Sequence, residues 1–199
     1  MKKMVFLFTL CCSFVVNAVG SPQAGEAKSA TCAACHGAKG VSSNPSFPSL
    51  AGQHASYFLK QLNDFKQGGT RPNAVMAPLV EGLSQQDKED LAAYYASLPL
   101  PEGFTPKKDL HRGELLYRGG DFEKHISACI ACHGPQGTGN AEAGFPVLSG
   151  QQPGYTVLQL EQFKDKKRQN DLNSIMQDIS ARMSPEDMNA VAHYIAGLH

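Results

Sequence analysis

Apolar residues recur at helical spacing near the end of each half of the chain. They follow the i, i+3, i+4, i+7 pattern of a helix that buries one face. The positions are Leu91, Tyr94, Tyr95 and Leu98 in the first half and Val191, Tyr194, Ile195 and Leu198 in the second. Ser84 and Ser184 precede these stretches as predicted N-caps, with acidic residues in the first turn that follows. Each half is therefore predicted to end on a strong helix.

Shorter helical patterns precede the terminal helix in each half. We expect helices over residues 25–34 and 57–66, and their counterparts over residues 110–118 and 155–164. No segment shows the alternation of apolar and polar residues that is typical of strands. The pattern predicts an all-α protein with long polar loops.

The N-terminus has the three parts of a secretory signal peptide. Lys2 and Lys3 are followed by an uncharged apolar run over residues 4–19, with small residues at Ala18 and Gly20. The run is shorter than the roughly 20 residues of a spanning helix. We expect residues 1–20 to direct export to the periplasm, with cleavage after Ala18 or Gly20, and an uncleaved anchor is the alternative. Lipidation at Cys11 or Cys12 is disfavoured, because no small residue precedes them.

Charge adds one exclusion. The chain has 18 Lys+Arg and 18 Asp+Glu. Removing the signal segment takes Lys+Arg from 18 to 16, a formal charge of −2. No basic stripe of a nucleic-acid-binding protein is present, so no nucleic acid partner is expected.

The chain repeats itself. The sequence Cys-x-x-Cys-His-Gly at residues 32–37 recurs at residues 129–134, an offset of 129 − 32 = 97. Phe-Pro-x-Leu-x-Gly-Gln at residues 47–53 recurs at residues 145–151, an offset of 98, and the offset reaches 100 at Met176. This pattern indicates a tandem duplication. We predict a first domain over residues 21–100, a Pro-rich linker over 101–108 and a second domain over 109–199.

The Cys-x-x-Cys-His motif predicts covalent haem attachment. Two cysteines three positions apart point to one side of a helical turn, and the adjoining histidine supplies the proximal iron ligand. Two alternatives carry less weight. A zinc site made from both pairs would bridge 129 − 35 = 94 residues, against about 15 to 20 in zinc ribbons. Oxidised Cys pairs would leave the repeated histidine unexplained.

The repeat also selects the second axial ligand. Met76 and Met176 coincide in both halves, each in an Asn-x-x-Met loop, whereas Met183 and Met188 have no methionine counterpart. We therefore predict axial thioether ligation by Met76 and Met176. The same test removes the histidines without a counterpart, which we predict to be surface residues: His54, His111, His125, His193 and His199.

With both motifs, both methionines and the Phe-Pro-x-Leu-x-Gly-Gln repeats, the chain resembles the cytochrome c4 family. The resemblance covers essentially the whole mature chain and implies two tandem class I cytochrome c domains. It implies one haem c held by Cys32, Cys35, His36 and Met76. It implies a second haem c held by Cys129, Cys132, His133 and Met176.

The resemblance also implies roles for residues around the ligands. The carbonyls of Pro48 and Pro146 would accept the proximal imidazole N–H groups. The resemblance also implies four contacts at the haem edge: Tyr57, Tyr155, Gln53 and Gln151. For the two tyrosines, packing in the core explains the repetition equally well.

Ligation by His and Met fills both axial positions, which suits an outer-sphere electron carrier rather than an enzyme. The family analogy suggests a bc1-type donor and a terminal oxidase as redox partners, with peripheral membrane association left open. Three alternatives remain. A di-haem peroxidase would need an open iron, the cytochrome subunit of a flavin dehydrogenase would differ in its partner, and a redox sensor would need an output domain.

Overall fold

The computed structural model describes residues 20–105 and 107–198, without the side chains of 107–109. Most of the predicted signal segment, with Cys11 and Cys12, and the C-terminal His199 lie outside the described residues. Every element of the described chain is a helix, apart from two isolated bridges between Asp121 and Ile126 and between Asn140 and Phe145. The all-α prediction is confirmed.

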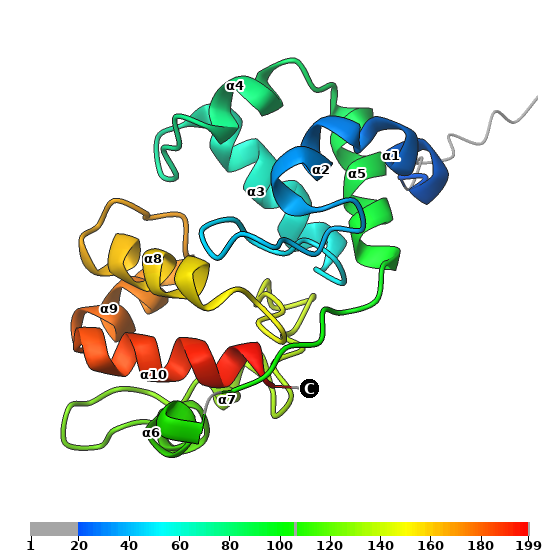
Figure 1. Cartoon of the computed structure of the whole chain (residues 1–199). Coiled ribbons are helices and arrows are strands. Elements are labelled where there is room, and N and C mark those ends of the chain that lie inside the picture. The colour runs from blue at the N-terminus through cyan, green and yellow to red at the C-terminus, as the bar shows by residue number, and fades with distance from the viewer. Residues whose placement is uncertain (1–19, 106, 199) are drawn as a thin grey trace, which may run out of the picture.

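The helices form two groups that correspond to the two halves of the sequence (Figure 1). The first group contains α1 (Pro22–Lys28), α2 (Ala30–His36), α3 (Ala55–Gln67), α4 (Met76–Glu81) and α5 (Gln85–Ser97). The second contains α6 (Lys107–Gly119), α7 (Ile130–His133), α8 (Pro153–Lys164), the 3-10 turn η1 (Leu172–Ser174), α9 (Ile175–Ala181) and α10 (Pro185–Ala196).

Reciprocal hydrogen bonds fix the start of both terminal helices. The Asp87 N–H donates to Ser84 Oγ over 3.1 Å, while the Ser84 N–H donates to the Asp87 carboxylate over 3.0 Å. Ser184 and Asp187 form the same pair of bonds, each of 3.1 Å. Such a capping box satisfies two N–H groups that the helix leaves without partners. The predicted N-caps at Ser84 and Ser184 are confirmed.

Each terminal helix crosses the first helix of its domain at a glycine. A Cβ atom at Gly25 would lie 2.1 Å from the Asp90 carbonyl oxygen, and one at Gly113 would lie 2.4 Å from the Ala190 carbonyl oxygen. Only a residue without a side chain permits such an approach. The crossing buries the predicted apolar stripes, with Leu91 1% exposed and Val191 1% exposed.

Two departures from the sequence prediction concern local structure. The helix expected over residues 25–34 is divided into α1 and α2 at Ser29, whose backbone N–H and hydroxyl both donate to the Glu26 carbonyl, over 3.1 Å and 2.8 Å. The polar loops that carry the repeated methionines contain the short helices α4 and α9, which the sequence did not predict. Met183 and Met188, 3% and 1% exposed, lie in the second hydrophobic core, as expected for residues that fill a core.

The chain between α5 and α6 lies against both domains (Figure 1). Leu100 packs against Gly52, and the Pro101 carbonyl approaches Gly150. The Thr105 hydroxyl donates to the Tyr194 carbonyl over 3.2 Å. These contacts hold the segment between the domains in place. None of the helices in the described part of the chain is long and apolar enough to cross a membrane.

Candidate cofactor sites

Both Cys-x-x-Cys-His motifs lie on helical turns. In the first domain, Cys32, Cys35 and His36 belong to α2, and His36 is its last residue. In the second, Cys129 is the N-cap of the single-turn helix α7, which ends at His133. The four cysteines are free and partly exposed, so the described structure does not support the alternative of oxidised Cys pairs.

Each motif histidine is buried and held by a proline carbonyl. His36 Nδ1 lies 2.8 Å from the Pro48 oxygen, and His133 Nδ1 lies 2.9 Å from the Pro146 oxygen. Burial lowers the pKa of both imidazoles, although the proline carbonyls act in the opposite direction. A neutral ring whose Nδ1–H donates to a carbonyl keeps its Nε2 lone pair for a metal ion. The Pro48 and Pro146 carbonyls therefore lie within hydrogen-bonding distance of the histidines, as their predicted role requires.

The cysteine thiols lie in apolar surroundings. Burial raises the pKa of the Cys32 thiol, and it raises the pKa of Cys129 to about 11. Both side chains pack against the hydrophobic core of their own domain. No cluster of three or more His, Cys, Asp or Glu side chains that could hold a metal ion occurs among the described residues.

The repeated methionines occupy corresponding places in the two domains. Met76 begins α4 and packs against the core that includes Cys32, while Met176 lies in the first turn of α9 and packs against the core that includes Cys129. Both are partly exposed. This position differs from that of the buried Met183 in the second core.

The side chain that holds each methionine differs between the domains. Asn73 Oδ1 accepts the backbone N–H groups of Val75 (3.0 Å) and Met76 (2.9 Å). In the second domain this role belongs to Asp171, whose carboxylate accepts the N–H groups of Met176 (2.8 Å) and Gln177 (3.1 Å).

The sequence match of Asn73 with Asn173 therefore does not extend to function. Asn173 and Ser174 are both in the left-handed conformation, with φ of 51° and 58°. Left-handed backbone costs about 1–2 kcal/mol per residue for L-amino acids. The second loop is longer by two residues, since 176 − 171 = 5 and 76 − 73 = 3, and the extra residues adopt this strained turn.

Two glutamines bind the backbone of the opposite domain in a reciprocal arrangement. Gln53 donates to the Val147 carbonyl and accepts the Val147 N–H, both over 3.0 Å. Gln151 donates to the Ser49 carbonyl over 3.0 Å and accepts the Ser49 N–H over 2.9 Å. Each glutamine follows a glycine with positive φ, Gly52 at 71° and Gly150 at 66°.

Two buried arginines also lie between the domains. Arg71, 6% exposed, donates to the Tyr155 hydroxyl over 2.9 Å, and Arg168, 5% exposed, donates to the Tyr57 hydroxyl over 2.8 Å. Both guanidinium groups also donate to Gln61 and Gln159. No ion pair with a carboxylate involves either arginine in the part of the chain that the structure describes.

The tyrosines and glutamines predicted as haem-edge contacts thus have their polar groups in contacts between the domains. The sequence reasoning missed Arg71 and Arg168, although 168 − 71 = 97 is the offset of the cysteine motifs. The same self-comparison would have found them.

The donor set fits two haem c groups. Each domain supplies two free thiols, one histidine oriented through Nδ1 and one methionine at the same core. The buried guanidinium groups of Arg71 and Arg168 have neutral hydrogen-bonding partners, and the Asp171 carboxylate acts on Arg168 through its charge. Buried charges are usually paired, and the two carboxylates of a haem would provide further negative charge beside these arginines.

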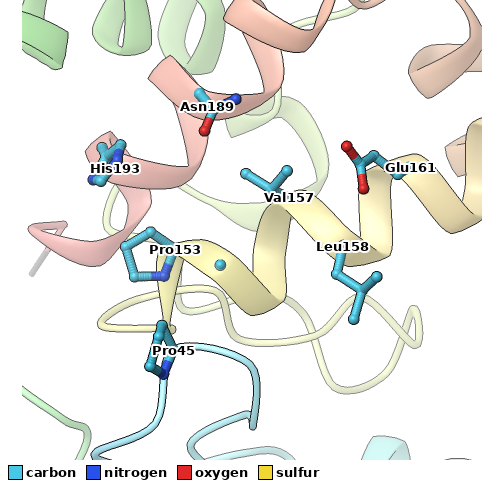
Figure 2. A pocket seen from close by; sticks show the side chains of 8 residues that line it. Pro45, Pro153, Val157, Leu158, Glu161, Asn189 and His193 are labelled. Carbon is cyan, nitrogen blue, oxygen red and sulfur yellow. The ribbon is translucent and has the colours of Figure 1, made fainter.

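The predicted surface histidines divide into three outcomes. His111 and His125 are exposed, as predicted. The prediction for His54 is wrong. This residue is the N-cap of α3 and follows Gln53, which binds the other domain. Its Nε2 is buried with no hydrogen-bond partner among the described residues. His193 is half-buried and lines a groove of about 350 Å³ with Pro45 and Pro153 (Figure 2). This groove contains none of the Cys, His or Met residues of the two sites.

Comparison with known proteins agrees with the two-site architecture. The Cytochrome c family model matches residues 23–99 and 120–199. A cytochrome c4 of Pseudomonas aeruginosa is 45% identical over 194 residues, 97% of this chain and 96% of the relative. The crystal structure of reduced recombinant cytochrome c4 from Pseudomonas stutzeri has a TM-score of 0.87 at 43% identity, and it covers 90% of this chain and 100% of that one.

A further relative carries a different name. The thiosulfate dehydrogenase electron acceptor of Stutzerimonas stutzeri is 38% identical over 172 residues, 84% of this chain and 78% of the relative. The chain therefore belongs to the cytochrome c4 family of electron carriers, whose two cytochrome c domains hold two covalently bound haem c groups.

Proposed function

We propose that the protein works in the periplasm as an electron carrier between respiratory-chain partners, towards a terminal oxidase, and that it is not an enzyme. The observation that carries the proposal is that each domain has a motif histidine held by a proline carbonyl and a repeated methionine that packs against the same core as the first motif cysteine. Such a histidine and methionine would together ligate a haem iron and leave no position for a substrate.

The proposed ligand sets follow the two domains. Cys32 and Cys35 would attach the first haem, and His36 and Met76 would ligate its iron. Cys129 and Cys132 would attach the second haem, and His133 and Met176 would ligate its iron. Haem, when bound, supplies a one-electron iron couple, and thioether ligation raises its reduction potential.

The protein contributes orientation and charge. The Pro48 and Pro146 carbonyls fix the rotation of the two imidazoles through Nδ1, which makes the rings better donors to iron. Arg71 and Arg168 supply positive charge between the domains, where a carboxylate of each haem would be stabilised. The hydrogen bonds that Gln53 and Gln151 form with the opposite domain hold the two domains in one arrangement. The distance between the two cofactors is thereby maintained.

The test is a visible spectrum of the purified protein, oxidised and reduced, with the haem-to-polypeptide ratio. We expect two haems per chain, low-spin iron in both states, the far-red band of Met-ligated ferric haem, and no binding of carbon monoxide. Replacement of Met76 by Ala and of Met176 by Ala should each remove half of the far-red band. A high-spin component that binds carbon monoxide in the wild-type protein would contradict the carrier function and favour a peroxidase.

The donor can be tested separately. The relative named as a thiosulfate dehydrogenase electron acceptor makes such a dehydrogenase one candidate donor, and the bc1 complex is the other. Reduction of the oxidised protein by each enzyme in stopped-flow experiments would distinguish them, because the true donor should reduce it faster and with a stronger dependence on ionic strength.

A further inference from the structure

The side chains of Gln53 and Gln151, which each bind the opposite domain, contact the two peptide groups that orient the motif histidines. The Pro146 carbonyl, which accepts His133, and the Val147 N–H, which donates to Gln53, belong to one peptide group. The Pro48 carbonyl and the Ser49 N–H form the corresponding peptide group for His36, and its N–H donates to Gln151. Val147 and Ser49 are 7% and 5% exposed, so water does not replace these bonds.

A hydrogen-bonded chain therefore crosses the domain boundary twice. In one direction it runs from His133 through the Pro146–Val147 peptide to Gln53, and its three groups are joined by bonds of 2.9 Å and 3.0 Å. A peptide group is planar and conjugated, so a bond at its N–H increases the electron density on its carbonyl oxygen. Consecutive hydrogen bonds strengthen one another in this way.

We infer that each glutamine is a positioning residue for the proximal histidine of the opposite domain: Gln53 acts on His133, and Gln151 acts on His36. This inference rests on the proposed ligand roles of the two histidines. The glutamine fixes the proline carbonyl in place and makes it a stronger acceptor for the imidazole Nδ1–H. A stronger acceptor gives the imidazole more anionic character, which stabilises ferric iron and lowers the reduction potential of that haem.

The expected effect is crossed between the domains. Gln53→Ala should raise the potential of the second-domain haem and leave that of the first-domain haem unchanged, and Gln151→Ala should do the reverse. We expect a three- to tenfold change in the redox equilibrium of the affected haem, and a tenfold change corresponds to about 59 mV. The measurement is a redox titration of the complete protein, in which NMR resonances shifted by the iron report each haem separately.

Gln152→Ala is the matched control. Gln152 also crosses the boundary, where its Nε2 donates to the Ser42 carbonyl over 2.5 Å, but no hydrogen bond joins it to either proline peptide group in the described part of the chain. It should weaken the interface without moving either potential. Its result separates the positioning effect from a general loosening of the two domains.

Two outcomes overturn the inference. One is a shift of the haem in the glutamine's own domain only, and the other is an equal shift of both haems that Gln152→Ala reproduces. The proposed function fails on a different observation, since a wild-type protein without the far-red band of Met-ligated haem contradicts the ligand sets before any variant is made.

Discussion

Replacement of Asp171 by Ala should loosen the Met176 loop more than replacement of Asn73 by Ala loosens the Met76 loop. Both side chains accept two backbone N–H groups at the start of a methionine-bearing helix. Asp171 additionally accepts the side-chain amide of Gln177 over 2.8 Å. The two loops differ in acceptor charge and in backbone strain, so the pair of variants isolates these two properties.

The magnitudes follow from these bonds. Hydrogen bonds to a charged group contribute about 1.5–3 kcal/mol each, so the two backbone bonds of Asp171 contribute about 3 kcal/mol at the lower end of that range. They oppose left-handed strain of about 1–2 kcal/mol at each of Asn173 and Ser174. The neutral bonds of Asn73 contribute about 1 kcal/mol each, and no non-glycine residue of the described first domain has positive φ. With about 3 kcal/mol lost at Asp171 and about 2 kcal/mol lost at Asn73, the second loop should lose about 1 kcal/mol more, which is roughly fivefold in the population of loops without bound methionine.

The assay is a titration of the oxidised protein with imidazole, which binds the iron once the methionine has left. Imidazole should bind more tightly to the second haem in Asp171→Ala and to the first haem in Asn73→Ala, and the gain over the wild type should be roughly fivefold larger for Asp171→Ala. Asp171→Asn should lie between, since it retains an acceptor without the charge. Equal changes in the two alanine variants, or a larger one in Asn73→Ala, would show that strain and charge do not distinguish the loops.

Three shorter predictions concern the scaffold. Gly113→Ala should destabilise the second domain by about 1–3 kcal/mol through overpacking, while Gly119→Ala, where a Cβ meets nothing within 4 Å, should not; urea unfolding of both variants checks this. Met183→Ala should cost about 2–5 kcal/mol in unfolding free energy and leave the far-red band intact, unlike a ligand variant. Burial opposes ionisation of Asp187, but bonds from Lys124 and Arg112 outweigh it and keep its pKa below its ordinary value. A folded-state pKa below the unfolded value of about 3.9 gives stability that is present above that pH and lost as the pH falls below it. Asp187→Asn should therefore flatten the acid limb of a stability–pH curve, and an unchanged limb would assign it to other carboxylates.

The sequence predicted the features that depend on local pattern or on exact repetition. The spacing of Leu91, Tyr94 and Tyr95 identified the terminal helix, because burial of one face requires that period. The coincidence of Met76 with Met176 separated two methionines from those that fill the core, and the structure places Met183 inside that core.

The features that escaped prediction depend on how the two domains meet. Arg71 and Arg168 are repeated, but nothing in their local sequence shows that each reaches a tyrosine of the other domain. His54 was assigned to the surface for lack of a counterpart, although its position beside Gln53 places it near the domain boundary. Relative domain orientation has no periodicity that a sequence can display.

Asp171 escaped for a different reason. An alignment of Asn73 with Asn173 maximises identity, and it places the two-residue insertion before the asparagine. The structure places the insertion after Asp171, because the carboxylate performs the capping and the extra residues form the left-handed turn. Because the two loops differ in length, the residue with the same role as Asn73 is Asp171, and not the residue of the same type.

The reciprocal contacts between the domains have the form of an isologous interface, by which two copies of one protein make a symmetric dimer. Joining the copies in one chain turns their association into an intramolecular event at millimolar effective concentration, so the assembly no longer depends on how dilute the protein is. Fusion also allows the partners to diverge. A homodimer must carry the same residue in both copies, whereas this chain has Asn73 in one half and Asp171 in the other. Each half can thus change within its own methionine loop while the surface that joins the two halves stays shared.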